Sequence, residues 1–383
     1  MPSYIKADQF FYPHGIRRGG YLELIDGKFG KHVDQVPEDA EVVDYTGYSI
    51  APGLVDTHIH GFGGVDVMDN NIEGTLHTMS EGLLSMGVTS FLPTTLTSSY
   101  EQLLAVTENI GAHYQEATGA KIRGIYFEGP YFTEEYKGAQ NPAYMKDPRM
   151  DEFRAWQKAA NGLLNKIALA PERDGVEDFV RTVTGEGVTV ALGHSNATFD
   201  EAKKAVDAGA SVWVHAYNGM RGLTHRELGM VGAMYEIPHT YAELICDGHH
   251  VDPKACDILI KQKGVENIAL ITDCMTAGGL EDGDYMLGEF PVVVDKGTVR
   301  LKSTGNLAGS ILKLKDGLKN VVEWGIANSH EAVMMASFNP AKSVHIDDVC
   351  GQIREGYDAD FIVLDKDLEL VATYLDGVKR YQA

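Results

Sequence analysis

The sequence predicts an α/β protein whose main part is a (β/α)8 barrel. In the middle of the chain, apolar β-rich runs alternate with helical stretches, which is the pattern of parallel strands joined by crossover helices. Eight such runs are present, and eight strands with their helices close a barrel of this kind. Polar residues close several of the runs, and these barrels carry their functional sites at the C-terminal ends of the strands.

The predicted barrel strands are short apolar runs, each followed by a turn signal or a polar residue. They are Gly53–His60, Val88–Pro93, Ile122–Gly129, Ile167–Pro171, Val188–His194, Ser211–His215, Tyr241–Asp247 and Ile268–Asp273. A chain of 383 residues exceeds one ordinary core, so we expect a second, smaller domain. Both chain ends read as short strands and turns. We therefore expect residues 1–50 and 350–383 to form a small β-sandwich domain, and residues 51–349 to form the barrel domain.

The composition is that of a globular protein, with 44% hydrophobic and 23% charged residues. A formal net charge of -22 would repel nucleic acid phosphates and anionic lipid, so we expect neither as a partner. The N-terminus has no basic region before a long apolar run, and no window has the length of a membrane span, so we expect a cytoplasmic protein. The four cysteines lack CxxC spacing and are expected to be reduced thiols.

Six residues that could bind a metal or carry a proton stand at the ends of predicted strands. They are His58, His60, Glu128, His194, His215 and Asp273. Residues i and i+2 of a strand project to the same face, so His58 and His60 can point into one barrel mouth. The His-x-His pattern alone is weak, and a surface or capping pair explains it equally well.

The two later histidines favour a metal. His194 and His215 each end a strongly apolar strand, the fifth and the sixth, where an unpaired polar group would be costly, and Glu128 ends the third run. Imidazole and carboxylate together are typical ligands of catalytic zinc, and they also suit iron, cobalt or manganese. Asp273 could accept a proton from water acidified by the ion and pass it on, although a plain loop aspartate is an alternative interpretation.

Several short motifs occur in order along the chain. They are APGLVDTHIHG (51–61), YFEGPY (126–131), KGAQNP (137–142), LGHSNAT (192–198), HAYNGM (215–220), ICDGHHV (245–251), TDCMTAG (272–278), LAGS (307–310) and NPAK (339–342). In these motifs the chain resembles the amidohydrolase superfamily and, within it, the N-acetylglucosamine-6-phosphate deacetylases. The resemblance covers effectively the whole chain, and the FEGP and HxxN segments are specific to the deacetylases.

The resemblance implies a TIM-like metal-dependent hydrolase barrel and an amidohydrolase that acts on a linear amide. It assigns a divalent cation to Glu128, His194 and His215, and the general acid and base role to Asp273. Because both histidines of the first-strand motif are present, a second ion at His58 and His60 is chemically allowed. The implied reaction is attack of metal-activated water on the acetamide of N-acetyl-D-glucosamine 6-phosphate, yielding D-glucosamine 6-phosphate and acetate in amino sugar catabolism.

Substrate contacts also follow from the resemblance. It assigns the phosphate to the backbone at Asn218 and Gly219 and to Arg226 of the neighbouring subunit of a homodimer, whereas a solvated charged loop explains the local residues without it. His250 corresponds to a sugar- and carbonyl-contacting histidine. The acetyl pocket corresponds to Leu307, Ala308 and Gly309. Ala139 and Gln140 are also assigned to substrate binding by the resemblance. At Gln140 the chain departs from the family, because glutamine replaces a histidine that contacts substrate and cannot carry its positive charge.

Two other functions remain open. The first is deacetylation of a related sugar phosphate such as N-acetylgalactosamine 6-phosphate, because a single protein contact to one sugar hydroxyl distinguishes this substrate from the glucosamine compound. A non-catalytic sugar-phosphate sensor that kept the fold would be expected to lose a ligand or the proton carrier, yet all are present. A cyclic amidase is disfavoured, because Glu128 takes the place of a bridging lysine and the third predicted strand has no lysine near its end.

Overall fold

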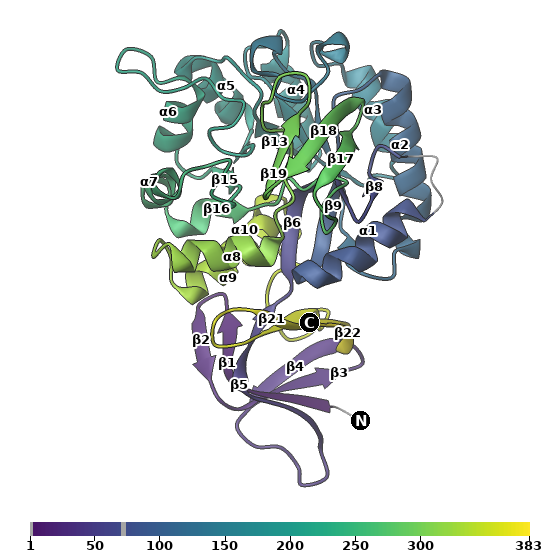
Figure 1. The fold of residues 1–383 in the computed structure, drawn as a ribbon, viewed down its shortest axis with the longest axis vertical. Helices are drawn as coiled ribbons and strands as arrows, with labels where there is room; N and C mark the ends of the chain where they lie inside the picture. The colour runs from purple at the N-terminus through teal and green to yellow at the C-terminus, as the bar shows by residue number, and fades with distance from the viewer. Residues whose placement is uncertain (1–2, 70–73) are drawn as a thin grey trace.

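The computed structural model describes residues 3–69 and 74–383. Figure 1 shows two parts, a barrel surrounded by helices and a small β domain that contains both termini. Both parts were predicted from the sequence. No helix among the described residues combines the length and the apolar character needed to cross a bilayer.

Eight parallel strands of the described chain form the barrel. They are β6 (Leu54–Ile59), β9 (Val88–Thr95), β11 (Ile125–Tyr131), β12 (Leu164–Leu169), β13 (Thr189–Leu192), β14 (Val212–Trp213), β15 (Tyr241–Leu244) and β16 (Ile268–Leu270). Each overlaps one predicted run, and each pairs with the next in chain order. The third run is divided, since its start belongs to β10 (Lys121–Ile122), which pairs with β9.

The barrel closes just beyond β16. Ile59 and Cys274 form a parallel bridge, and the N–H of His60 donates to the carbonyl of Cys274 at 2.8 Å. The N–H of Asp273 donates to the carbonyl of His58 at 2.9 Å. The first and last barrel strands are therefore joined where candidate site residues lie.

Helices cover the outside of the barrel (Figure 1). They are α1 (Thr75–Leu83), α2 (Tyr100–His113), α3 (Met150–Ala159), α4 (Val176–Gly185), α5 (Phe199–Ala208), α6 (Gly229–Glu236), α7 (Pro253–Lys263), α8 (Leu314–Glu323), α9 (Ser329–Ala336) and α10 (Phe338–Ser343). Capping boxes determine where two of these helices begin. Thr198 and Glu201 form one at the start of α5, and Asn328 and Glu331 form the other at the start of α9.

An antiparallel sheet that the sequence analysis did not anticipate lies between β16 and α8. It consists of β17 (Gly283–Leu287), β18 (Phe290–Asp295) and β19 (Thr298–Leu301). Its buried face, with Leu287 and Val292, packs against Leu96, Met275 and Ala308. Because Leu96 and Met275 follow barrel strands closely, this sheet covers part of the C-terminal side of the barrel.

The small domain joins the two ends of the chain in one sheet. Its strands are β1 (Ser3–Tyr12), β2 (Gly15–Arg18), β3 (Tyr21–Ile25), β4 (Lys28–Val33), β5 (Glu41–Pro52), β20 (Phe361–Leu364), β21 (Leu370–Leu375) and β22 (Val378–Gln382). Pairing of β5 with β20 connects the N-terminal and C-terminal strands. The predicted strand at 41–45 is the start of the longer β5, which leads directly into β6. The domain boundaries at residues 50 and 350 stay a prediction.

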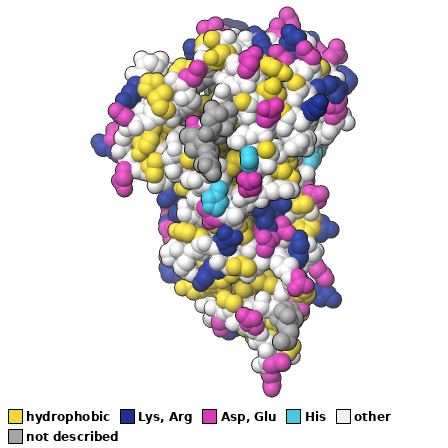
Figure 2. Space-filling view, turned by 90° about the vertical axis from the view of Figure 1, so that its right-hand side faces the viewer, with side chains coloured by type: hydrophobic (Ala, Val, Ile, Leu, Met, Phe, Trp, Pro, Cys, Tyr) yellow, Lys and Arg dark blue, Asp and Glu magenta, His cyan; other side chains and the backbone are white. Residues whose placement is uncertain are grey.

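An ion-pair cluster links the small domain to the barrel. The ammonium of Lys121, beside β9, contacts Asp358, Asp360 and Asp376 at 2.7–2.9 Å. Arg123 adds a contact of 3.0 Å to Asp358. Elsewhere on the face in Figure 2, acidic and basic side chains are interspersed.

Candidate metal centre

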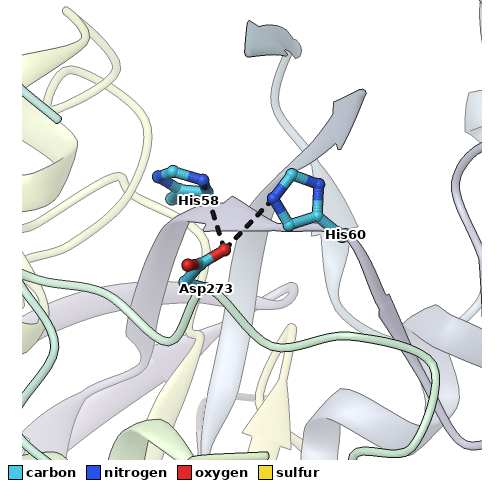
Figure 3. A group of neighbouring side chains, drawn as sticks. All are labelled: His58, His60 and Asp273. Atoms are coloured by element: carbon cyan, nitrogen blue, oxygen red, sulfur yellow. Dashed lines mark ion pairs between the residues drawn. The ribbon is translucent and has the colours of Figure 1, made fainter. Parts of the chain in front are cut away.

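All six predicted strand-end residues meet in the barrel mouth, and all six are buried. They form two groups, in each of which the possible ligand atoms lie within 4.8 Å of one another. The first cluster is Glu128, His194 and His215. The second cluster is His58, His60 and Asp273, and Figure 3 shows both of its imidazoles facing the carboxylate of Asp273.

The backbone turns sharply at three of these residues. His194, His215 and Asp273 have φ values of 48°, 24° and 51°. This left-handed region is unfavourable for residues with a Cβ, at about 1–3 kcal/mol each, so the surrounding structure must hold these three residues in place. At Gly219 (φ 62°) a Cβ would lie 2.9 Å from Nδ1 of His194, so glycine is needed there.

Backbone carbonyl groups orient three of the four imidazoles. Nδ1 faces the carbonyl of Thr94 at 3.1 Å in His60, of Tyr136 at 2.8 Å in His194, and of Asn218 at 3.0 Å in His215. A carbonyl only accepts, so each Nδ1 carries the hydrogen and each neutral ring keeps its lone pair on Nε2. The three lone pairs therefore point inward.

The inward-facing imidazole nitrogens and the carboxylate of Glu128 are arranged to bind a cation. Nε2 of His194 and Nε2 of His215 lie 3.1 Å apart, and they lie 3.2 Å and 3.1 Å from Oε1 of Glu128. When both imidazoles are neutral and oriented in this way, neither Nε2 carries a hydrogen that could bond to the other nitrogen or to Oε1 of Glu128. A divalent ion would accept the lone pairs of all three atoms. In the second cluster, Nε2 of His58 is buried without a hydrogen-bond partner. Both clusters thus fit a metal ion by the chemistry of their donors.

Glu128 connects the clusters. Its Oε1 faces His194 and His215, and its Oε2 lies 3.3 Å from Nε2 of His60. Nε2 of His60 also lies 3.1 Å from Oδ1 of Asp273. One carboxylate therefore reaches both groups.

The charges in the site favour ionised carboxylates. Burial alone would raise the pKa of Glu128, but His58, His194 and His215 hold it well below the ordinary value. Burial also opposes ionisation of Asp273, yet His58 and His60 lower its pKa. Asp273 is consequently a carboxylate at neutral pH, the form that accepts a proton.

The histidines show the reciprocal effect. Burial disfavours the imidazolium of His215, but in the metal-free chain the Glu128 carboxylate beside Nε2 outweighs burial and raises the pKa of His215 to about 9. Asp273 and Glu128 likewise raise the pKa of His60 against burial. The carboxylates of Glu128 and Asp273 stabilise positive charge at the C-terminal end of the barrel, whether that charge is carried by protons or by a metal ion.

A small cavity of about 140 Å³ opens onto the clusters. It is lined by most of the sequence-predicted site residues: His60, Glu128, Ala139, Gln140, His194, His215, Asn218, Gly219, His250, Asp273, Leu307, Ala308 and Gly309. His58 lies behind this lining, and Arg226 is exposed on a loop away from it. A larger cavity of about 450 Å³ shares Leu96 and Ala139 with the first but touches neither cluster.

Gln140 is engaged with the first cluster. Its Oε1 accepts a hydrogen bond from the N–H of Thr97 at 2.7 Å, which turns its amide nitrogen to donate to Oε2 of Glu128. The side chain is buried. Gln140 thus lines the cavity and at the same time supports Glu128.

Sequence reasoning missed three residues that hold the site in place. Glu243 of β15 contacts His58, Lys166 of β12 contacts Glu243, and Asp247 contacts Nδ1 of His250 at 2.6 Å. Burial disfavours ionisation of Glu243, but Lys166 and His58 lower its pKa to about 2. A signal was available, because Lys166 and Glu243 are charges of opposite sign inside otherwise apolar strands.

Comparison with known proteins agrees with this geometry. The chain matches the amidohydrolase family over residues 49–380. It is 40% identical over 357 residues to an N-acetylglucosamine-6-phosphate deacetylase of Vibrio furnissii, covering 93% of this chain and 86% of the relative. It is 36% identical to an N-acetylgalactosamine-6-phosphate deacetylase of Escherichia coli O157:H7, covering 98% and 99%.

A solved structure is similar throughout. It is a mutant N-acetyl-D-glucosamine-6-phosphate deacetylase of Mycobacterium smegmatis in complex with N-acetyl-D-glucosamine-6-phosphate. The TM-score is 0.94 at 29% identity, with 100% of both chains covered. The barrel, the small domain and their arrangement are therefore those of these relatives.

Proposed function

The chain belongs to the amidohydrolase family, and from this premise we propose that it is a metal-dependent deacetylase of N-acetyl-D-glucosamine 6-phosphate. The products are D-glucosamine 6-phosphate and acetate. The observation that carries the proposal is the cavity in which Asp273, the first cluster and the motifs shared with the deacetylases meet.

Glu128, His194 and His215 would hold one divalent ion, and His58, His60 and Asp273 would hold a second. Their nitrogen and oxygen donors suit zinc, iron, cobalt or manganese. When bound, the ion supplies a Lewis acid that polarises the amide carbonyl and increases the acidity of water.

Asp273 moves the proton. As water adds to the acetamide carbonyl carbon, the Asp273 carboxylate takes a proton from that water. It then donates the proton to the amide nitrogen as the C–N bond breaks, so that acetate and the free amine leave. The low pKa of Asp273 beside His58 and His60 supplies the basic form for the first of these steps.

His250 faces the same cavity, and Asp247 orients it. Because the Asp247 carboxylate accepts from Nδ1 of His250 at 2.6 Å, Nε2 is left for the substrate. We assign Nε2 to the sugar or the acetamide oxygen. Leu307, Ala308 and Gly309 would surround the acetyl methyl group.

The phosphate would be bound by the backbone around Asn218 and Gly219, which line the cavity; the N–H of Asn218 itself donates to the carbonyl of His215 at 3.0 Å. Arg226 is exposed in the single chain, so its assigned role requires a second subunit. We therefore propose a homodimer in which each Arg226 completes the neighbouring site. The cytoplasmic location expected from the sequence stays a prediction.

N-acetylgalactosamine 6-phosphate is the second candidate substrate. It is favoured by the relative from Escherichia coli O157:H7, which bears that activity in its name and is 36% identical over 98% of this chain. The two sugars differ in one hydroxyl configuration. Comparing kcat/KM for the two sugar phosphates decides between them, and a higher value for the galactosamine compound would replace the first proposal.

Acetate release from N-acetylglucosamine 6-phosphate tests the reaction. We expect turnover by the metal-loaded protein, loss of turnover on chelation, and recovery when the ion is restored. Asp273→Asn should lower kcat by about 10²–10⁴-fold, the usual contribution of a positioned acid or base. Undiminished turnover of that variant would rule out the role given to Asp273, and no acetate from either sugar phosphate would favour a sensor.

A further inference from the structure

A buried ion pair lies inside the barrel behind His58. The ammonium of Lys166 on β12 contacts Oε1 of Glu243 on β15, and both side chains are fully buried. Neither lines the substrate cavity. Buried ion pairs are costly to desolvate, and apolar residues of similar volume in their place are often neutral or stabilising. This pair therefore calls for a role other than stability.

Both carboxylate oxygens of Glu243 contact other groups of the protein. Oε1 faces Lys166, while Oε2 lies 3.1 Å from Nδ1 of His58 and accepts from the N–H of His215 at 3.3 Å. Lys166 is fixed in turn, with its Nζ 3.4 Å from the carbonyl of Thr57 and 3.8 Å from the ring centre of Tyr126. The carboxylate has little freedom to leave His58.

His58 differs from the other three histidines of the two clusters in the partner of its Nδ1. They direct Nδ1 at backbone carbonyls, whereas His58 directs it at a side chain from another strand. Since the Glu243 carboxylate only accepts, Nδ1 of His58 carries the hydrogen and Nε2 keeps its lone pair. That Nε2 is buried without a hydrogen-bond partner, 3.5 Å from Oε1 of Glu128 and 3.5 Å from Oδ1 of Asp273.

We propose that the Lys166–Glu243 pair positions His58 as a metal ligand and thereby sets the affinity of the second cluster for its ion. Glu243 fixes the ring and the nitrogen that stays free, and Lys166 fixes Glu243. Both are positioning residues, because neither touches the ion or the substrate. The inference rests on the metal centre of the proposed function, but not on the identity of the substrate.

Metal titration of the stripped protein tests this. Zn²⁺ is added against a competing chelator, and bound zinc is counted by elemental analysis. We expect two equivalents for the wild type. The double variant Lys166→Met/Glu243→Met leaves no unpaired buried charge, and it should bind the second ion about 10–100-fold more weakly, as is usual when an outer partner of a ligand is lost. The first ion should be retained.

Two further variants separate positioning from general damage. Lys166→Met/Glu243→Gln keeps a hydrogen-bond acceptor for His58, so it should fold and lose less affinity than the Met pair. Lys121→Met removes a lysine that pairs with three aspartates of the small domain, and it should bind both ions as the wild type does.

A double-mutant cycle shows whether the pair acts through His58. His58→Asn removes the ligand itself, so adding Lys166→Met/Glu243→Met to it should change zinc binding no further. If the two Met substitutions weaken zinc binding as much in the His58→Asn protein as in the wild type, or weaken binding at the first cluster, then the Lys166–Glu243 pair has only a structural role.

The proposal is overturned if folded Lys166→Met/Glu243→Met protein binds both ions with wild-type affinity, if Lys166→Met/Glu243→Gln binds the second ion no more tightly than the Met pair does, or if the wild type binds one. Acetate assays on the wild type report separately on the proposed function. Two bound ions without deacetylation would contradict that function and leave the inference on His58 standing.

Discussion

The two clusters of the metal centre are built in different ways. In the first, the imidazoles of His194 and His215 are oriented by backbone carbonyls, and both residues sit in strained left-handed backbone. In the second, His60 is likewise oriented by a backbone carbonyl and Asp273 has left-handed backbone, but His58 depends on the side chain of Glu243, which depends on Lys166. A site held by the backbone tolerates nearby substitutions, whereas one held by remote side chains can be altered by a single change. We therefore expect the first cluster to be robust and the second adjustable.

Glu128→Ala should have the largest effect, because it breaks both clusters. Glu128 contributes one oxygen to each. Loss of the Lewis acid removes several kcal/mol of transition-state stabilisation, so kcat/KM should fall by about 10³-fold or more. Elemental analysis should show less than one bound ion. Retention of both ions would mean that Glu128 is not a shared ligand.

His194→Asn and His58→Asn form a matched pair that sharpens the comparison. The first removes a ligand of the first cluster, and we expect loss of nearly all acetate release. The second should lose one equivalent of metal while keeping most of its acetate release, because the first cluster is left intact. Equal losses of activity in the two variants would show that the clusters are equally essential.

Gln140→Ala tests the support that Glu128 receives from outside the clusters. A hydrogen bond to a charged group is worth about 1.5–3 kcal/mol, so kcat/KM should fall by about 10–150-fold. Gln140→His should recover part of the activity if the imidazole donates to Glu128 as the amide does. A change in KM alone for both variants would instead assign Gln140 to substrate binding.

Lys121→Met should have the smallest effect on catalysis. It removes contacts to Asp358, Asp360 and Asp376 between the barrel and the small domain. Because Lys121 is partly exposed, we expect the free energy of unfolding to fall by only about 1–3 kcal/mol, below the cost of breaking a fully buried pair. Thermal unfolding measures this loss, and kcat at 25 °C should be unchanged. A fall in kcat would couple the small domain to the metal centre.

Sequence patterns predicted the barrel well, because most of its strands lie in largely apolar runs and the polar residue that closes such a run marks the C-terminal end. The same rule placed His194, His215 and Asp273 together at the barrel mouth. The three-stranded sheet β17–β19 was missed because it lies outside the repeating strand–helix pattern, although the alternating burial of β18 and the turn at Lys296 and Gly297 are typical of antiparallel strands.

The supporting residues of the site were harder to predict. Lys166 and Glu243 lie 77 positions apart in the chain, and only the closing of the barrel brings β12 and β15 to the same interior. Their signal, a charge within an apolar strand, does not indicate the partner. The carbonyl groups that orient His60, His194 and His215 carry no sequence signal, because every residue has one.

Acetate release during stepwise addition of Zn²⁺ to the metal-stripped wild type is the most direct test of a deacetylase with one robust and one adjustable metal cluster. With N-acetylglucosamine 6-phosphate as substrate, we predict that most of the activity returns with the first equivalent and that the second adds a smaller increase. This prediction would be contradicted if no acetate were released with two equivalents of Zn²⁺ bound, or if activity appeared only after the second equivalent was added.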